Sequence, residues 1–247
     1  MRNLSFCFAL CCVYTHLYVD ATNNLNRLEK KMFDHKVPPM KLDTKRTALV
    51  FTDLHNDFLS QDGKAYGLLA ESLARNNTAQ NIERLFKAAK AVGMKVFVSP
   101  HYYYPHDHKW IVPITPLEDL AHKIGLVNRN GPLSLDGFKG SGADFPERYK
   151  SYIYDENTIV TSPHKAYGTS TNDMILQLRR YRIEKIVLAG PVGNLCVEAH
   201  MRDFIEHDGV EPGAMAGYAA RNLSTVCAST VAANNAVAIA NRRMRYI

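Results

Sequence analysis

The sequence predicts an α/β fold in which a mostly parallel sheet carries helices on both faces. Two observations lead to this prediction. Short, continuously apolar runs of strand length recur along the chain, and segments with helical spacing of apolar residues separate them. Strands and helices that alternate in this way are typical of parallel sheets. With 247 residues, 46% hydrophobic and 22% charged, the chain can bury one large core.

The first strand is expected at Thr47–Thr52 and ends at Asp53. A helix capped by Thr78 follows, and Gly93 ends it. Its apolar positions follow helical spacing: Ile82, Leu85, Phe86 and Ala89. Met94–Val98 has the composition of a second strand buried on both faces.

The segment 100–156 is rich in Pro, Gly, His and Tyr. It is too long for a simple connection, so we expect a lid or pocket-building excursion with a short helix near Leu117–Ile124. A third short strand, Thr158–Thr161, then leads to Pro163–Lys165.

Thr171 or Asn172 is expected to cap the next helix, which continues to Arg182. A fourth strand is expected at Lys185–Ala189, and a turn that contains Cys196 follows it. The helix after this turn has its apolar face at Val197, Met201, Phe204 and Ile205.

The chain after Gly209 fits this pattern less well. Residues 211–218 contain proline and two glycines and cannot form a buried strand. Residues 223–231 could form a displaced fifth strand and 232–244 a final helix, so the last strand is expected to be divergent or missing.

The N-terminal stretch resembles a secretory signal, with Arg2, the apolar run Leu4–Tyr14 and a small-x-small site at Val19–Ala21. The run is too short for a membrane anchor. We therefore expect a secreted protein, with a cytoplasmic one as the alternative. The predicted division is a signal peptide at 1–21, a leader at 22–44 and one domain at 45–247.

Removal of that signal would leave two cysteines, Cys196 and Cys227, and hence no disulfide framework. The two could still pair with each other. The net charge of +6 is spread along the chain, without zinc-finger spacing or an aromatic-basic motif. We expect a small-molecule ligand and neither nucleic acid nor a membrane as partner.

Three chemically distinct residues, Asp53, Lys165 and Cys196, each follow the carboxyl end of a predicted parallel strand. Ligands bind at that edge of an open α/β sheet. The carboxylate can take a thiol proton, the ammonium can orient both anions, and the helix N-terminus favours a thiolate. The backbone N–H groups of Val192 and Cys196 could receive a developing oxyanion. Taken singly, each has a structural alternative: a small buried apolar cysteine, a turn aspartate, a solvated lysine.

Three segments, Val50–Phe58, Ser162–Gly168 and Leu188–Val197, resemble the signatures of the isochorismatase-like cysteine hydrolases, a superfamily that includes nicotinamidases, N-carbamoylsarcosine amidohydrolases, ureidoacrylate hydrolases and isochorismatases. The resemblance extends from about Lys45 to Gly209. It implies a Rossmann-like three-layer sandwich and a triad formed by Asp53, Lys165 and Cys196. It also implies a cis peptide at Pro191–Val192, a pocket lined by Phe58 and a homo-oligomer.

The chain departs from the family pattern at two places. Gly193 stands where many members have Thr. Nicotinamidases bind a metal through an Asp-x-His pair, and here the position is Ser99-Pro100-His101. His101, His106 and His108 lack typical ligand spacing, so we expect no metal and no other cofactor. We expect His101 and Tyr167 to join Phe58 in a substrate pocket.

These features predict a hydrolase that cleaves a carbon–nitrogen bond of a small amide, carbamoyl or ureido compound through a Cys196 thioester. The first alternative is isochorismatase-type hydrolysis of a vinyl ether by proton transfer from the aspartate. The second is a non-catalytic protein that binds a small molecule on the same fold.

Overall fold

The computed structural model describes residues 42–112 and 115–208. Its sheet has four parallel strands in the order β3-β2-β1-β4. The strands are β1 (Thr47–Thr52), β2 (Lys95–Ser99), β3 (Thr158–Val160) and β4 (Lys185–Ala189). Val50 pairs with Phe97 on one side and with Leu188 on the other, so all the strands end at the same edge of the sheet. The predicted parallel α/β fold is confirmed.

The helices are α2 (Asn56–Leu59), α3 (Tyr66–Arg75), α4 (Thr78–Ala91), α5 (Pro116–Ile124), α6 (Glu147–Ile153), α7 (Met174–Arg180) and α8 (Glu198–Asp208). Two 3₁₀ turns occupy Asp107–Lys109 and Thr169–Thr171, and a π-helical turn occupies Gly193–Val197.

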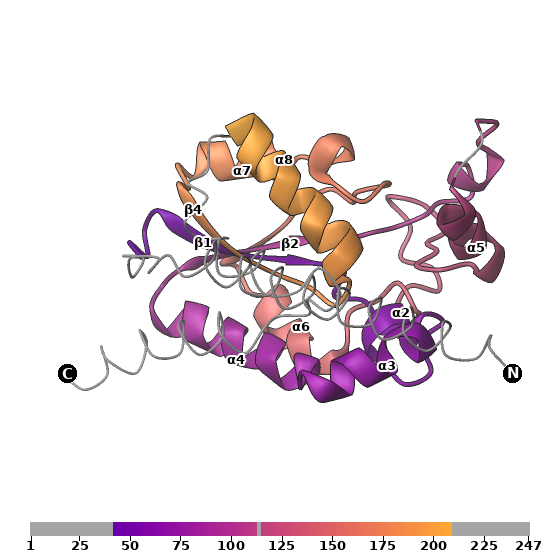
Figure 1. Cartoon of the computed structure of the whole chain (residues 1–247), viewed down its shortest axis with the longest axis horizontal. Helices are drawn as coiled ribbons and strands as arrows, with labels where there is room; N and C mark the ends of the chain where they lie inside the picture. The colour runs from indigo at the N-terminus through magenta and orange to yellow at the C-terminus, as the bar shows by residue number, and fades with distance from the viewer. Residues whose placement is uncertain (1–41, 113–114, 209–247) are drawn as a thin grey trace, which may run out of the picture. The chain divides into compact units, whose positions relative to one another are not determined.

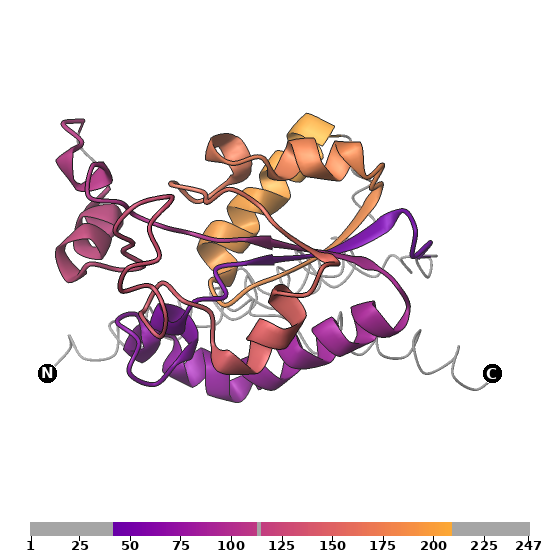
Figure 2. The same ribbon diagram turned by 180° about the vertical axis from the view of Figure 1, so that it is seen from behind.

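The helices cover both faces of the sheet, α4 and α6 on one side and α7 and α8 on the other (Figures 1 and 2). Alternate residues of β1 supply the two cores. Leu49 and Phe51 pack under α4 and α6, whereas Ala48 and Val50 pack under α7 and α8. The continuous apolar composition of β1 follows from this burial on both faces, as predicted from the sequence.

The structure adds three helices that the sequence patterns did not predict, α2, α3 and α6, and changes the ends of two others. Asn77, not Thr78, precedes α4, with a left-handed backbone (φ 47°) and no side-chain cap. The segment at Thr169–Thr171 is a 3₁₀ turn, so α7 begins only at Met174 and ends at Arg180. Helix α7 is therefore shorter than predicted, because the chain before it first crosses the carboxyl edge of the sheet.

The excursion over 100–156 is held in place by buried carboxylates. The Val127 N–H donates to Asp57 Oδ2 (2.7 Å), and the Lys64 N–H donates to Oδ1 of the same residue (3.2 Å). Inside this excursion, Thr115 and Glu118 form a capping box at the start of α5, close to the predicted helix. The excursion therefore has a fixed position beside the strand ends.

Several predicted features lie outside the described residues. These are the signal peptide at 1–21, most of the leader at 22–44, and the displaced strand and final helix expected within 223–244. Within the described part of the chain, no helix is both long and apolar enough to cross a bilayer.

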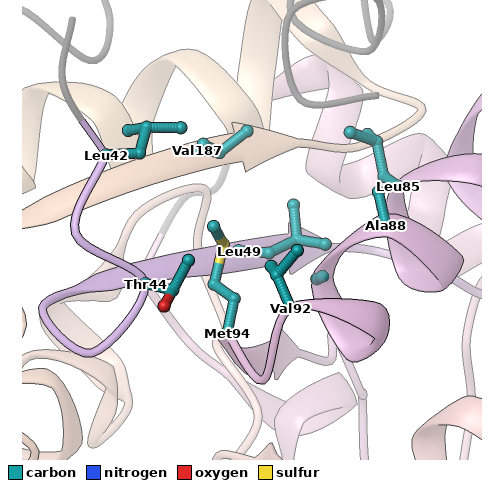
Figure 3. Close-up of a pocket in the computed structure, with 9 residues that line it drawn as sticks. Leu42, Thr44, Leu49, Leu85, Ala88, Val92, Met94 and Val187 are labelled. Atoms are coloured by element: carbon teal, nitrogen blue, oxygen red, sulfur yellow. The ribbon is translucent and has the colours of Figure 1, made fainter. Parts of the chain in front are cut away.

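A small apolar hollow lies between α4 and the sheet (Figure 3). Its volume is about 20 Å³, and Leu49, Leu85, Met94 and Val187 are among the residues that line it. A space of this size holds about one water molecule. It is therefore a packing feature.

Candidate functional site at the carboxyl edge of the sheet

Asp53 follows β1 and is completely buried. Its backbone is left-handed, with φ 58°, and its N–H donates to Ser99 O (3.1 Å) at the end of β2. A left-handed residue other than glycine is uncommon, and such conformations occur often at functional sites. The turn places the carboxylate at the strand edge, where the sequence predicts it.

Cys196 is a free, buried thiol in the π-helical turn that joins β4 to α8. The close approach of this turn to β1 requires glycine at position 190, since an added Cβ would lie 2.4 Å from Thr52 Oγ1. Burial raises the pKa of the Cys196 thiol well above its usual range, and the nearby Asp53 carboxylate raises it further. The expected thiolate is therefore wrong for the resting state, because burial outweighs the helix N-terminus. The sulfur carries its proton beside a carboxylate.

Two imidazoles face Asp53. His164 Nε2 lies 3.2 Å from Asp53 Oδ1, and His101 Nδ1 lies 3.8 Å from the same oxygen. Burial alone would raise the pKa of Asp53, but His164 and then His101 and His55 outweigh it and hold this pKa well below its usual range. Asp53 is accordingly a carboxylate in a completely buried position.

A chain of hydrogen bonds fixes which nitrogen of His164 carries hydrogen. His200 Nδ1 lies 2.8 Å from Cys196 O, and because a carbonyl only accepts, Nδ1 is the donor. Burial lowers the pKa of His200 to about 4, so at neutral pH its Nε2 accepts a hydrogen bond from Ser99 Oγ (2.9 Å). Asn172 Nδ2 donates to the same hydroxyl (2.8 Å).

With its own hydrogen directed at His200, Ser99 Oγ can only accept from His164 Nδ1, which lies 3.0 Å away. Nδ1 therefore bears hydrogen, and the Nε2 of a neutral His164 would direct its lone pair at the Asp53 carboxylate. Two lone pairs facing each other at 3.2 Å repel. A cation between Nε2 and the carboxylate would remove this repulsion.

Lys165 has other partners. Its Nζ donates to Asp107 Oδ2 (2.5 Å) and to Tyr102 O (2.7 Å), and it lies 3.5 Å from the centre of the Tyr104 ring. Among the described residues, Lys165 forms no ion pair with Asp53. The structure thus brings Asp53 and Cys196 together and directs Lys165 toward the excursion, while its role in a triad stays a prediction.

The expected cis peptide at Pro191–Val192 is absent, since every described peptide bond is trans. Val192 directs its carbonyl toward the N–H groups of Leu195 (3.4 Å) and Val197 (3.3 Å), which closes the π-helical turn without a cis bond. The Cys196 N–H lies against its own sulfur. The oxyanion role of the Val192 and Cys196 N–H groups stays a prediction.

A cavity of about 220 Å³ opens beside Cys196. The three residues expected in a substrate pocket, Phe58, His101 and Tyr167, all line it. The remaining walls are mostly aliphatic or aromatic, and among the described residues that line the cavity, Glu118, which caps α5, alone bears a formal charge. Burial keeps the pKa of His101 well below its ordinary value, so this wall is uncharged at neutral pH. The cavity suits a small neutral molecule.

The metal-binding pair of nicotinamidases has no equivalent here, since Ser99 stands in place of the carboxylate and its hydroxyl already contacts His164, His200 and Asn172. A different set of side chains could hold an ion. One ligand atom from each of Asp53, His101, His164 and Cys196 lies within 4.8 Å of the others.

Sequence reasoning missed His164, Ser99 and His200 as members of the site. His164 adjoins the predicted Lys165, and a bridge that pairs His101 with His164 turns its ring, not the lysine, toward Asp53. The only signal was its position after the third strand. His200 lies one turn after Cys196 on α8, so its spacing of four from the proposed nucleophile could have indicated it.

Comparison with known proteins shows the family of this chain. A family model described as the isochorismatase domain matches residues 47–212. The chain belongs to the isochorismatase family of hydrolases. No match was found among curated proteins.

Solved structures with a similar fold include a cysteine hydrolase from Pseudomonas syringae pv. phaseolicola 1448A, with 20% identity, a TM-score of 0.52 and coverage of 68% of this chain and 70% of that chain. An N-carbamoylsarcosine amidase from Thermoplasma acidophilum has 16% identity and a TM-score of 0.44, covering 64% of this chain and 75% of that chain. A nicotinamidase/pyrazinamidase from Bacillus subtilis has 19% identity and a TM-score of 0.46, covering 64% and 78%. At 20% identity, the similarity to the cysteine hydrolase concerns the fold alone.

Proposed function

We propose that this protein hydrolyses a carbon–nitrogen bond of a small, uncharged amide, carbamoyl or ureido compound through a thioester on Cys196. One observation carries the proposal: a buried thiol that lines a cavity of about 220 Å³ adjoins a buried carboxylate. A carboxylate next to a thiol is the arrangement of a nucleophile with its general base.

In the first half of the reaction, the Cys196 sulfur attacks the substrate carbonyl carbon while Asp53 takes the thiol proton. His164, 3.2 Å away, lowers the pKa of Asp53 and so favours its charged form before the transfer. The tetrahedral intermediate then collapses as its carbon–nitrogen bond breaks, and Asp53 returns the proton to the leaving nitrogen. Ammonia or an amine departs, and the acyl group remains on sulfur.

In the second half, water attacks the thioester, with Asp53 again accepting a proton. The carbon–sulfur bond breaks, and the proton returns to the sulfur. The sum of the two halves is amide plus water giving acid plus amine. The backbone N–H groups of Val192 and Cys196 are the proposed donors to the oxyanion in both halves.

Vinyl ether hydrolysis of isochorismate fits the cavity less well. That substrate carries two carboxylates, whereas the part of the cavity wall formed by residues 42–112 and 115–208 has no Lys or Arg and contains Glu118. An anion that enters an apolar site without a cationic partner loses its hydration without compensation. A purely binding function leaves the strained Asp53 and its contact with the thiol without a role.

The test is a panel of neutral amides, carbamoyl and ureido compounds incubated with purified protein while ammonia or amine release is followed. Rapid acid quenching and mass spectrometry should detect an acyl group on the Cys196 peptide. The Cys196→Ala variant should lose the adduct and lower turnover by about 10³-fold or more. Turnover of Cys196→Ala at the wild-type rate would refute the covalent mechanism. Absence of turnover on the whole panel, together with reversible binding of its members, would favour the non-catalytic alternative.

A further inference from the structure

The four strands of the sheet each contribute one side chain to a single buried cluster. Asp53 follows β1, His101 follows β2, His164 follows β3 and Cys196 follows β4. One carboxylate oxygen, two imidazole nitrogens and one sulfur lie within 4.8 Å of one another, and all four residues are buried. These are the ligand types that bind zinc in proteins.

Several of these ligand atoms have no hydrogen-bond partner. Both carboxylate oxygens of Asp53, His101 Nε2 and His164 Nε2 are buried and unpaired by hydrogen-bond geometry. Buried polar atoms are nearly always hydrogen-bonded, and an unpaired group requires an explanation such as a catalytic role or a bound ion. Of these atoms, His164 Nε2 and Asp53 Oδ1 face each other at 3.2 Å, and His101 approaches the same oxygen with its Nδ1 (3.8 Å).

The separations agree with tetrahedral coordination. Zinc bonds of 2.0–2.3 Å place neighbouring ligand atoms about 3.3–3.8 Å apart. Asp53 Oδ1 lies 3.2 Å from His164 Nε2 and 3.8 Å from His101 Nδ1. The largest separation in the cluster, 4.8 Å at most, therefore has to shorten by about 1 Å when an ion binds.

The surroundings of His164 are those of a metal ligand. Its Nδ1 donates to Ser99 Oγ, which Asn172 and His200 hold in position. Histidine ligands usually donate their second ring N–H in this way, which orients the first nitrogen toward the metal. Charge also balances, because a thiolate, a carboxylate and two neutral imidazoles carry two negative charges, equal and opposite to a divalent cation.

We propose that Asp53, His101, His164 and Cys196 form a reversible binding site for a thiophilic divalent cation of the zinc type, and that its occupancy switches off hydrolysis. Binding displaces the thiol proton, which is released to solvent. The sulfur and the carboxylate are then metal ligands and cannot act as nucleophile and base. The inhibitory part of this inference rests on the proposed function, whereas the binding site itself does not.

Cobalt(II) is the probe, because it binds zinc sites and reports on its ligands by absorption. Chelator-treated full-length protein is titrated with Co²⁺ at fixed neutral pH. We expect one equivalent to bind, with visible bands of tetrahedral cobalt and a near-ultraviolet thiolate-to-cobalt band. The Cys196→Ser variant should lose the thiolate band, and His164→Ala should weaken binding at least tenfold. Circular dichroism and thermal unfolding check that each variant is folded.

The matched control is a pair of histidines at the surface. His108 and His122 face each other, with their Nδ1 atoms 2.6 Å apart, and they form the obvious competing site for an adventitious ion. The double variant His108→Ala/His122→Ala should bind Co²⁺ as the wild type does and retain the thiolate band. Loss of binding in this variant, or the absence of a thiolate band from wild type at one equivalent, overturns the site.

Activity separates the two parts of the inference. On a substrate turned over by the metal-free protein, one equivalent of Zn²⁺ should abolish hydrolysis and a chelator should restore it. Equal turnover with and without bound Zn²⁺ overturns the inhibitory role. If the thiolate band appears but the metal-free protein hydrolyses nothing on the panel, the cation site stands, and the proposed function and its inhibition fall together.

Discussion

His164 Nε2 lies 3.2 Å from Asp53 Oδ1, and both side chains are fully buried. The hydrogen-bond chain through Ser99 and His200 places a hydrogen on the opposite nitrogen of His164. The side chain that faces the carboxylate is therefore the histidine, although the sequence predicted that Lys165, its neighbour, would have this position.

This pairing predicts different effects of two adjacent substitutions. His164→Gln removes the imidazole that lowers the pKa of Asp53, so burial should raise the pKa of that carboxyl and favour its protonated form. A protonated Asp53 cannot take the thiol proton, and kcat/KM should fall by about 10²–10³-fold. The acid limb of the pH profile of kcat/KM should move to higher pH in this variant.

Lys165→Met is the matched comparison, since its ammonium is bonded to Asp107 and Tyr102 O. We expect a smaller loss and an unchanged acid limb. In the reverse result, Lys165→Met would be inactive, and His164→Gln would be active with an unshifted pH profile. That result would show that Lys165, and not His164, acts on Asp53, as the sequence predicted.

The sequence was sufficient to predict the sheet, because strands buried on both faces must be continuously apolar, and β1 and β2 have that composition. It also predicted that Asp53 and Cys196 would meet, since parallel strands end at one edge. It could not decide between His164 and Lys165. Adjacent residues in extended chain point in opposite directions, and the bridge between His101 and His164 sets that direction.

The cis peptide is a second case in which the resemblance did not carry over. The turn after β4 closes here through the carbonyl of Val192, which accepts from Leu195 and Val197. This local hydrogen bonding produces a π-helical turn over Gly193–Val197 with trans peptides. The sequence pattern places a turn at this position, but the backbone path through it depends on packing against β1.

Buried histidines predict that the protein loses stability in mild acid. Burial lowers the pKa of both His55 and His200 from 6.5 to about 4. Between these pH values the unfolded chain binds protons that the folded chain does not. The contribution of these two uncharged histidines to the free energy of unfolding is therefore complete above pH 6.5. It is lost as the pH falls toward 4, by up to about 1.4 kcal/mol per pH unit for each histidine.

Urea unfolding at several pH values between 4.5 and 7.5 measures this slope. His200→Asn should make the slope shallower by up to about 1.4 kcal/mol per pH unit, because one titrating group is removed. The control is His106→Asn, whose side chain is 69% exposed, and it should leave the slope as in wild type. An identical slope in wild type and His200→Asn would contradict the burial of an uncharged His200.

The contact between Gly190 and Thr52 predicts a site that is intolerant of any side chain. A Cβ at position 190 would lie 2.4 Å from Thr52 Oγ1 and 2.9 Å from Thr52 O. Since the backbone oxygen cannot move away cheaply, Gly190→Ala should destabilise the fold by about 1–3 kcal/mol, measured by urea unfolding. Gly67→Ala in α3 is the control, because a Cβ there meets nothing within 4 Å and should be neutral or slightly stabilising. Equal stability of the two variants would refute the close approach of β1 and β4.

The composition of the cavity predicts a preference for neutral substrates. Glu118 is the charged residue in a wall that is otherwise apolar or neutral, so an anionic group would be desolvated there without a cation beside it. Butyramide and succinamate form a suitable pair, because both present a primary amide on a short chain and differ in a terminal carboxylate. We expect kcat/KM to be at least about tenfold higher for the neutral amide, a modest value for one uncompensated charge.

Leu117→Arg adds a cation at an exposed position of the wall and should lower the ratio of kcat/KM for butyramide to that for succinamate without moving Cys196. A wild-type preference for succinamate would instead require a cation in the cavity. The most direct source of that cation is Lys165, released from Asp107. In that case the Lys165→Met variant should lose the preference for succinamate.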